Sequence, residues 1–217
     1  MKKLIVLMLI LINSSLLMAQ FGLSGGMTVL KGFNAPKPFV GFHIGGEIPR
    51  DDQLSFYGRL SFLVKQSESI KTVATLYDPT FTSSTELSYI NSMNYTILEG
   101  GNRYYIGNGY DSGFGAYGGG KLLLIFNSVK RKYDSYDQVK FPLPDSELPK
   151  GSIFNIAVGL GGGIKNTFSG IGTVYLDAGL SYMIMSTGSN ATAESVGSTL
   201  YSPLIFTFNL GFRKDLY

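Results

Sequence analysis

Polar and apolar side chains alternate with a period of two residues along several segments of this chain. In residues 54–64 the even positions are Leu, Phe, Gly, Leu, Phe and Val, whereas the odd positions are Ser, Tyr, Arg, Ser and Leu. Successive side chains of a β-strand point to opposite faces, so this segment has one apolar and one mostly polar face. An amphipathic helix would need apolar residues three and four positions apart. The pattern therefore predicts a β-strand.

The same alternation predicts eight strands in total. We expect them at residues 21–30, 38–48, 54–66, 95–106, 114–127, 153–165, 173–185 and 203–213. The connections at 49–53, 107–113 and 166–172 are short and rich in turn-forming residues, whereas those at 67–94, 134–151 and 186–202 are long. Short turns at one end and mostly long loops at the other are typical of outer-membrane barrels. We predict an all-β fold, an eight-stranded antiparallel up-and-down transmembrane β-barrel.

A soluble barrel around an apolar ligand cavity shows the same alternation with its two faces exchanged. The polar face favours lipid outside, because it combines small residues and tyrosines with charges of both signs that can pair in a narrow lumen. Aromatic residues also recur near the strand ends, as interfacial girdles do. We therefore predict contact with membrane lipid and a lumenal polar network, which consists of Glu47, Arg59, Glu99, Arg103, Lys121 and Asp177.

The first residues have the layout of a signal peptide. Lys2 and Lys3 precede the nine apolar residues 4–12, and Ala19 precedes Gln20. Nine apolar residues are too few to span a hydrocarbon layer of ~30 Å as a helix. We predict a signal peptide at 1–19, cleaved near Ala19, and an outer-membrane β-barrel domain at 20–217. The expected location is the cell outer membrane.

Composition narrows the chemistry. The chain has no cysteine, which excludes disulfides, thiolate metal sites and cysteine nucleophiles. A formal net charge of +3 is too small to suggest a nucleic-acid partner. With a single histidine, a zinc site would depend on carboxylates, so we expect no metal and no cofactor.

His43 is the one residue that could support hydrolysis. A serine hydrolase would have to use it as the base, with Ser24, Ser61 and Asp177 as neighbours in the lumen. The interpretation of His43 as a polar lumen filler is favoured, so no enzyme and no catalytic residue is predicted. A membrane-embedded hydrolase using His43 stays as the alternative.

The lumen and the loops suggest different roles. The interior of an eight-stranded barrel is just filled by side chains, which favours a packed plug over the other alternative, a narrow pore or transporter for small molecules. The loop at 134–151 is rich in aromatic residues and proline, a composition that suits protein contact. Tyr133, Tyr136 and Phe141 are its interaction candidates.

The chain resembles the PorT-like group of small outer-membrane barrel proteins. The resemblance rests on Ala19-Gln20, Asn-Arg-Tyr-Tyr-Ile at 102–106, Phe-Gly-Ala-Tyr-Gly-Gly-Gly at 114–120, the glycine-rich strand 156–164 and Phe-Asn-Leu-Gly-Phe at 208–212. The terminal Tyr217 fits a barrel insertion signal, whereas residues 213–217 depart from a clean alternating end. The resemblance implies a structural or accessory role in a surface or secretion assembly, with other outer-membrane or secretion proteins as partners.

Overall fold

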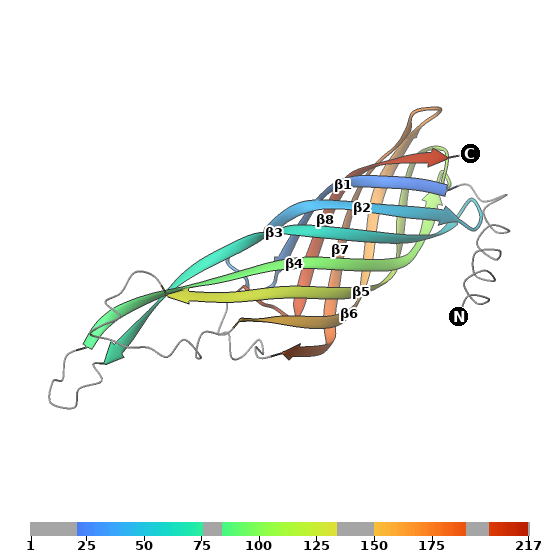
Figure 1. Cartoon of the computed structure of the whole chain (residues 1–217). Helices are drawn as coiled ribbons and strands as arrows, with labels where there is room; N and C mark the ends of the chain where they lie inside the picture. The colour runs from blue at the N-terminus through green and yellow to red at the C-terminus, as the bar shows by residue number, and fades with distance from the viewer. Residues whose placement is uncertain (1–20, 76–83, 134–149, 190–199, 217) are drawn as a thin grey trace, which may run out of the picture.

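The computed structural model describes residues 21–75, 84–133, 150–189 and 200–216 (Figure 1). These residues form eight β-strands, which are β1 (Phe21–Gly32), β2 (Phe39–Pro49), β3 (Leu54–Thr75), β4 (Ser84–Gly107), β5 (Gly113–Tyr133), β6 (Lys150–Phe168), β7 (Gly172–Ser189) and β8 (Leu204–Leu216). Each strand pairs antiparallel with the next one in the chain, and β8 pairs with β1 along its whole length, which closes the barrel. The predicted eight-stranded, antiparallel, up-and-down barrel is confirmed.

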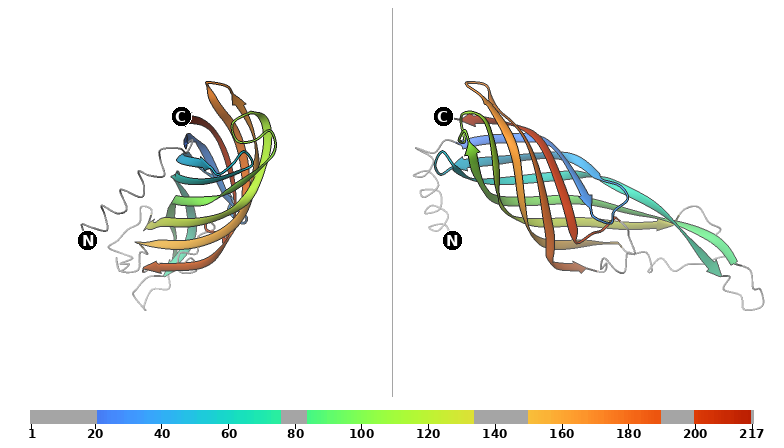
Figure 2. Two further views of the ribbon diagram at one scale, coloured as in Figure 1. Left: turned by 90° about the vertical axis from the view of Figure 1, so that its right-hand side faces the viewer. Right: turned by 180° about the vertical axis from the view of Figure 1, so that it is seen from behind.

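The strands run obliquely around a common axis, as the two further views in Figure 2 show. The paired ends of β1 and β8, Phe21 and Leu216, lie at the end of the barrel that carries the short turns between β2 and β3, β4 and β5, and β6 and β7. We call this the turn end and the opposite one the loop end. The predicted signal peptide at 1–19 lies outside the described residues and stays a prediction.

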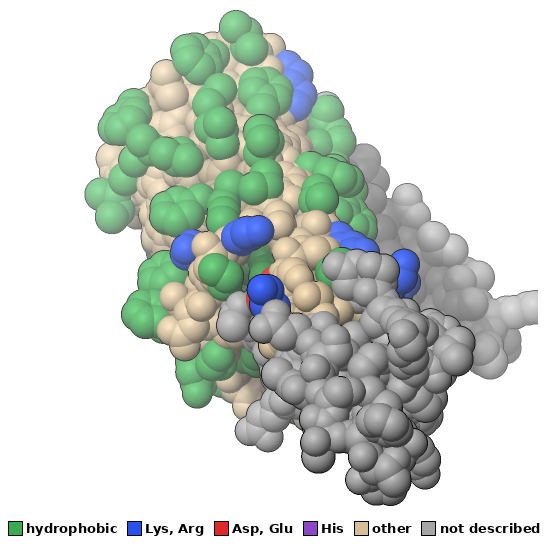
Figure 3. Space-filling model, turned by 90° about the vertical axis from the view of Figure 1, so that its left-hand side faces the viewer, with side chains coloured by type: hydrophobic (Ala, Val, Ile, Leu, Met, Phe, Trp, Pro, Cys, Tyr) green, Lys and Arg blue, Asp and Glu red, His purple; other side chains and the backbone are tan. Residues whose placement is uncertain are grey.

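The outward face of the barrel wall is apolar (Figure 3). On β3 the even-numbered Phe56, Phe62 and Val64 are 51%, 37% and 63% exposed, while the odd-numbered Ser55 and Ser61 are buried. The other strands repeat this arrangement, with exposed residues that include Leu23, Met27, Phe42, Ile44, Leu98, Leu122, Phe126, Leu160, Leu176, Leu180, Phe208 and Leu210. A soluble protein rarely exposes so continuous an apolar surface. Among the described residues, no helix is long and apolar enough to span a membrane.

The connection predicted at 67–94 is the main error of the sequence interpretation. Instead of a long loop, β3 and β4 continue as a paired hairpin from Gln66↔Met93 to Thr75↔Ser84. A bulge between Leu63 and Gln66 leaves two consecutive residues exposed and exchanges the faces of the positions that follow. On β3 the side chains of residues 66–71 are then at least partly exposed on both faces, so the alternation of buried and exposed residues that marks the wall is lost there.

Other strands also exceed their predicted bounds, and the long connections predicted at 134–151 and 186–202 are correspondingly shorter. Strand β8 continues past Arg213 to Leu216, and its alternation persists, with Arg213 and Asp215 buried and Lys214 exposed. The departure from clean alternation expected at 213–217 is therefore wrong for the residues up to Leu216. Most of the eight strands are longer than the ~9–11 residues that a tilted strand needs to cross a bilayer.

The inside of the barrel has two chemically different parts. Toward the loop end it holds a buried apolar cluster, formed by Leu30, Phe39, Leu63, Met93, Tyr95, Ile97, Leu123, Ile125, Val129, Ile153, Ala157, Met183, Leu200 and Ile205. Toward the turn end it holds charged and polar side chains. The alternation in the sequence marked inward positions correctly, but it did not reveal that one end of the lumen would be apolar.

Candidate functional site

The six charged residues predicted for the lumen all lie inside the barrel and are 1–9% exposed. They come from β2 (Glu47), β3 (Arg59), β4 (Glu99 and Arg103), β5 (Lys121) and β7 (Asp177), because each occupies an inward position of its strand. Residues that are far apart in sequence thus meet across the barrel.

Asp177 is the centre of this network. Its Oδ2 lies 2.8 Å from Arg59 Nη2 and 2.9 Å from Arg103 Nη2, so one carboxylate binds two guanidinium groups. The amide of Asn209 donates a further hydrogen bond of 2.6 Å to Asp177 Oδ1. Charged donors and acceptors make the stronger class of protein hydrogen bond, and several such bonds compensate for the cost of burying these ions.

The remaining members extend the network on both sides. Arg103 Nη1 lies 2.6 Å from Glu47 Oε2, and Arg59 Nη1 lies 3.7 Å from Glu99 Oε1. Lys121 Nζ lies 3.4 Å from Glu99 Oε2. The order Glu47, Arg103, Asp177, Arg59, Glu99 and Lys121 is therefore one connected chain in which negative and positive groups alternate.

Sequence reasoning missed a second set of charges at the turn end. Arg213 of β8 lies 3.2 Å from Glu47 Oε2 through Nη1, and its Nε lies 2.9 Å from Asp215 Oδ1. Lys165 Nζ donates to the backbone carbonyl of Ser112 at 2.6 Å. The sequence contained a signal for them, because Lys165, Arg213 and Asp215 continue the alternation by which every second residue of their strands points inward.

Tyrosines surround the arginines. Arg103 lies between the rings of Tyr57 and Tyr117, with its guanidinium carbon 4.5 Å and 4.7 Å from the two ring centroids. The hydroxyl of Tyr57 donates to Glu99 at 2.8 Å, and that of Tyr105 donates to Glu47 at 2.5 Å. These rings supply cation–π contact and hydrogen bonds from one side chain, which allows a dense polar core.

Tyr110 covers the network at the turn end. It belongs to the turn between β4 and β5, is 1% exposed, and its ring lies 3.6 Å from the guanidinium carbon of Arg213. Its hydroxyl donates to Asp215 Oδ1 at 2.9 Å. Burial raises the pKa of this hydroxyl, so it stays protonated and remains a donor. A turn residue thereby separates the charges of the lumen from the solvent at this end.

His43 is fully engaged by neutral hydroxyl groups. Its Nδ1 lies 2.8 Å from Thr28 Oγ1, and its Nε2 lies 2.7 Å from the hydroxyl of Tyr175. Because the hydroxyl of Thr28 itself donates to Asn209 Oδ1, it accepts a hydrogen bond from the histidine. Asp177 instead binds the arginines, and both ring nitrogens have partners other than a serine. This geometry does not assemble a Ser-His-Asp hydrolase.

The space left in the polar part of the lumen is very small. A cavity of about 20 Å³ lies among Tyr57, Glu99, Arg103, Tyr117 and Lys121, which is room for roughly one water molecule. Gly163 and Gly179 contribute to this fit, because a Cβ at either position would collide with the neighbouring Tyr117 or Lys121. Among the described residues, no cluster of three or more histidine, cysteine or acidic side chains is arranged to hold a metal ion.

Of the three predicted interaction residues of the loop, the structure describes only Tyr133. Tyr133 is the last residue of β5 and pairs with Tyr89 of β4, which lies midway along the hairpin. Tyr136 and Phe141 lie outside the described residues. Next to Tyr133, Arg131 Nε donates to Asn91 Oδ1 at 3.0 Å, and its guanidinium carbon lies 4.3 Å from the centroid of the Tyr89 ring. Strand β5 thus supports the hairpin from one side.

Taken together, the fold and the filled lumen define a small eight-stranded β-barrel with an apolar wall. The chain is similar to a major outer membrane protein from Thermus thermophilus, with a TM-score of 0.50 and 12% identity over 91% of this chain and 99% of that one. It is also similar to Neisserial surface protein A, with a TM-score of 0.44 and 10% identity over 90% and 95% of the two chains. A third similar structure is the N-terminal β-barrel domain of Pseudomonas aeruginosa OprF, with a TM-score of 0.44 and 12% identity over 91% and 100%.

At these identities the likeness concerns the fold alone. No protein-family model matches the chain, and no curated protein matches it. The resemblance to the PorT-like group is therefore not confirmed, whereas the likeness to small outer-membrane barrels is.

Proposed function

We propose that this protein is a non-conducting outer-membrane barrel that anchors the β3–β4 hairpin as a docking platform for another outer-membrane or secretion protein. The observation that carries the proposal is the combination of a filled lumen with strands that continue beyond the wall. The long strands extend beyond the proposed membrane-spanning wall, and they do not enclose an open channel.

Location in the outer membrane is supported by three independent features. The wall exposes an apolar surface, the N-terminal residues have the layout of a signal peptide, and the fold is that of small outer-membrane barrels. A closed barrel satisfies all of its backbone hydrogen bonds internally, which is the condition for a β-structure in lipid.

Neither of the alternative roles is favoured. Ion pairs occupy one part of the lumen and an apolar cluster occupies the other, which argues against an aqueous path through the described part of the barrel. His43 is 1% exposed and holds two hydroxyl groups, so a substrate has no access to it. We therefore propose neither transport through the lumen nor catalysis.

The hairpin offers a surface of definite chemistry. Strand β2 pairs with β3 only as far as Gly41↔Leu63, so within the described residues the edge of β3 at 64–75 has no strand beside it. This edge is roughly 40 Å long at about 3.3 Å per residue. A strand edge that no other strand covers presents backbone donors and acceptors to which an extended segment of another protein can add.

Affinity purification from detergent-solubilised outer membranes tests the proposal. In one variant an Asn-Gly turn replaces residues 67–92, so that Gln66 and Met93, which are already paired, become the new end of the hairpin. In the control variant a short Gly-Ser linker replaces residues 134–149, which removes Tyr136 and Phe141 and keeps the hairpin.

We expect a stoichiometric partner that is lost from the first variant and retained by the control. A partner lost only from the control would place docking on the loop and contradict the hairpin platform. A wild-type protein that purifies alone would contradict the accessory role itself. In every case heat-modifiable migration on a gel shows that the barrel is folded.

A further inference from the structure

Five lysines form a basic collar around the outer surface at the loop end. The collar consists of Lys31 on β1, Lys37 before β2, Lys65 on β3, and Lys130 and Lys132 on β5. All five are exposed, and none forms a hydrogen bond or an ion pair with another residue in the described ranges. Figure 3 views the molecule from this end and shows lysine and arginine side chains where the apolar wall gives way to polar surface.

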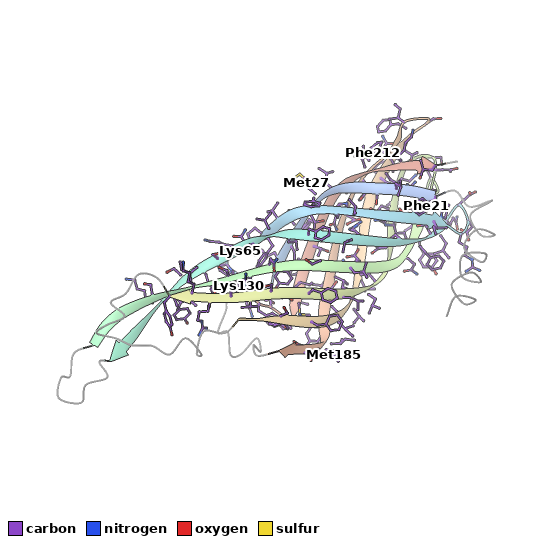
Figure 4. All side chains as sticks on the ribbon, in the orientation of Figure 1. Phe21, Met27, Lys65, Lys130, Met185 and Phe212 are labelled. Carbon is purple, nitrogen blue, oxygen red and sulfur yellow. The ribbon has the colours of Figure 1, made fainter. Side chains whose placement is uncertain are left out.

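The collar follows directly on the apolar wall. On β3 Lys65 comes immediately after the exposed Val64, because the bulge turns both side chains outward. On β5 Lys130 and Lys132 continue the outward positions that begin with Leu122 and Phe126. Figure 4 places Lys65 and Lys130 beyond Met27 in the direction of the hairpin. A lysine at such a boundary can keep its stem on apolar surface while its ammonium group reaches the polar layer.

The turn end lacks such a surface. Its exposed charged side chains in the described part are Arg50 and Lys214 against Asp51, Asp52 and Asp111. Lys214 is moreover occupied by the backbone carbonyls of Gly170 and Ile171. At the loop end, by contrast, Glu68 is the one acidic residue whose side chain is described. Among the described side chains, the excess of exposed positive charge is therefore confined to one of the two ends of the barrel.

We propose that the basic collar binds the phosphate-bearing headgroups of anionic lipids in the leaflet at the loop end. The inference rests on the proposed membrane location. Unpaired ammonium groups that lie just past an apolar wall face the headgroup layer of the bilayer, and phosphate is the anion that this layer supplies. Several lysines on neighbouring strands provide point charges without a fixed geometry, which suits mobile headgroups better than one fixed small ion.

The chain itself offers one competing source of negative charge. Residues 134–149 contain Asp134, Asp137, Asp145 and Glu147 against Lys140, and they follow the collar residues of β5 in the sequence. The test must therefore separate lipid from this segment.

The experiment is native mass spectrometry of the full-length mature protein in neutral detergent with equimolar phosphatidylglycerol and phosphatidylcholine. We expect the wild type to retain phosphatidylglycerol severalfold in excess. The variant K65Q/K130Q lowers this excess, and replacement of all five lysines by glutamine abolishes it. The conservative variant K65R/K130R keeps it. The matched control R50Q/K214Q removes two cations from the turn end and leaves the excess unchanged.

Four results would overturn the inference. Equal retention of the two lipids by the wild type would contradict it, and so would an equal loss in the control. Displacement of the bound lipid by inorganic phosphate alone would show a small-anion site instead. If K65Q/K130Q lowers thermal stability without lipid and leaves retention unchanged, the collar pairs with the acidic segment.

Alkaline extraction of membranes tests the membrane location separately. A protein that is extracted contradicts the proposed function. If the protein stays in the membrane but shows no lipid preference, only the inference about the collar is wrong.

Discussion

Asp177 shows how a small β-barrel can bury many charges at once. Its carboxylate binds Arg59 and Arg103 at 2.8 Å and 2.9 Å, and it accepts a hydrogen bond from Asn209. A buried ion pair stabilises little in comparison with an apolar contact of the same size, but the loss of one partner leaves uncompensated charge in a poorly solvated place. The network is therefore most sensitive at Asp177, which joins its two arginines.

We expect Asp177→Ala to lower the free energy of unfolding by about 3–5 kcal/mol, because it removes the anion that two buried guanidinium groups share. Urea titration in detergent micelles measures this, followed by circular dichroism because the chain contains no tryptophan. Asp111→Ala, in the exposed turn between β4 and β5, is the control and should change stability little. An equal cost for the two variants would contradict a cohesive network.

Small residues on the inward face are a second requirement at this scale. A Cβ at Gly211 would collide with the hydroxyl and the ring of Tyr175, which holds His43. We expect Gly211→Ala to destabilise the barrel by about 1–3 kcal/mol through overpacking. Gly58→Ala is the matched control on the outward face of β3, where a Cβ meets no atom within 4 Å. Equal unfolding midpoints in urea would show that the lumen is looser than its contacts indicate.

At the scale of elements, the sequence was most informative where one face of a strand forms the apolar outer wall and the other faces the lumen. The strands at 38–48 and 54–66 were predicted within a few residues of β2 and the barrel part of β3, because burial on one side alone enforces alternation. The six lumenal charges were predicted from the same parity.

Beyond the wall, that signal disappears for a physical reason. Residues 66–71 of β3 have polar side chains on both faces, so their pairing with β4 leaves no period of two to detect. The bulge at Val64 and Lys65 also shifts the inward positions by one. The pairing of particular charges across the barrel depends on which strands face each other, and periodicity contains no such information.

The hairpin should be separable from the barrel that supports it. Replacing residues 67–92 by Asn-Gly removes pairs that lie outside the wall, so we expect the urea midpoint of the barrel to change by little. Hydrogen exchange of the intact protein is the complementary measurement. Amides of 66–75 should exchange much faster than those of 54–63, because few buried apolar contacts hold the hairpin. Equal protection would contradict a projecting element.

Tyr110 illustrates how a turn contributes to the barrel. Its hydroxyl binds Asp215 and its ring covers Arg213, although the residue itself belongs to no strand. We expect Tyr110→Ala to open the turn end to water and to lower the free energy of unfolding by about 3–5 kcal/mol, as for other buried aromatic truncations. Tyr110→Phe should recover most of this loss, because it keeps the ring over Arg213. If the phenylalanine variant is as unstable as the alanine variant, the hydroxyl rather than the ring dominates.

At the scale of the whole molecule, the lumen of the barrel is filled by two chemically different groups of side chains, one at each end. Charges and tyrosines fill the turn end, an apolar cluster fills the loop end, and an apolar wall surrounds both. The wall suits lipid, the interior excludes flow, and the remaining length of β3 and β4 projects from the loop end (Figure 1). Together these features favour an anchored scaffold over a channel or an enzyme.

Cysteine accessibility along β3 in reconstituted vesicles tests this account most directly, because the natural chain contains no cysteine. Single variants Leu60→Cys, Ser61→Cys and Ser69→Cys are treated with a water-soluble maleimide before and after denaturation. We predict that the outward Leu60→Cys and the inward Ser61→Cys stay unlabelled in the native state, while Ser69→Cys on the hairpin reacts and all three react after unfolding. Labelling of Ser61→Cys would mean a water-filled lumen, and labelling of Leu60→Cys would mean a barrel whose wall faces water. Either result would contradict a sealed membrane barrel.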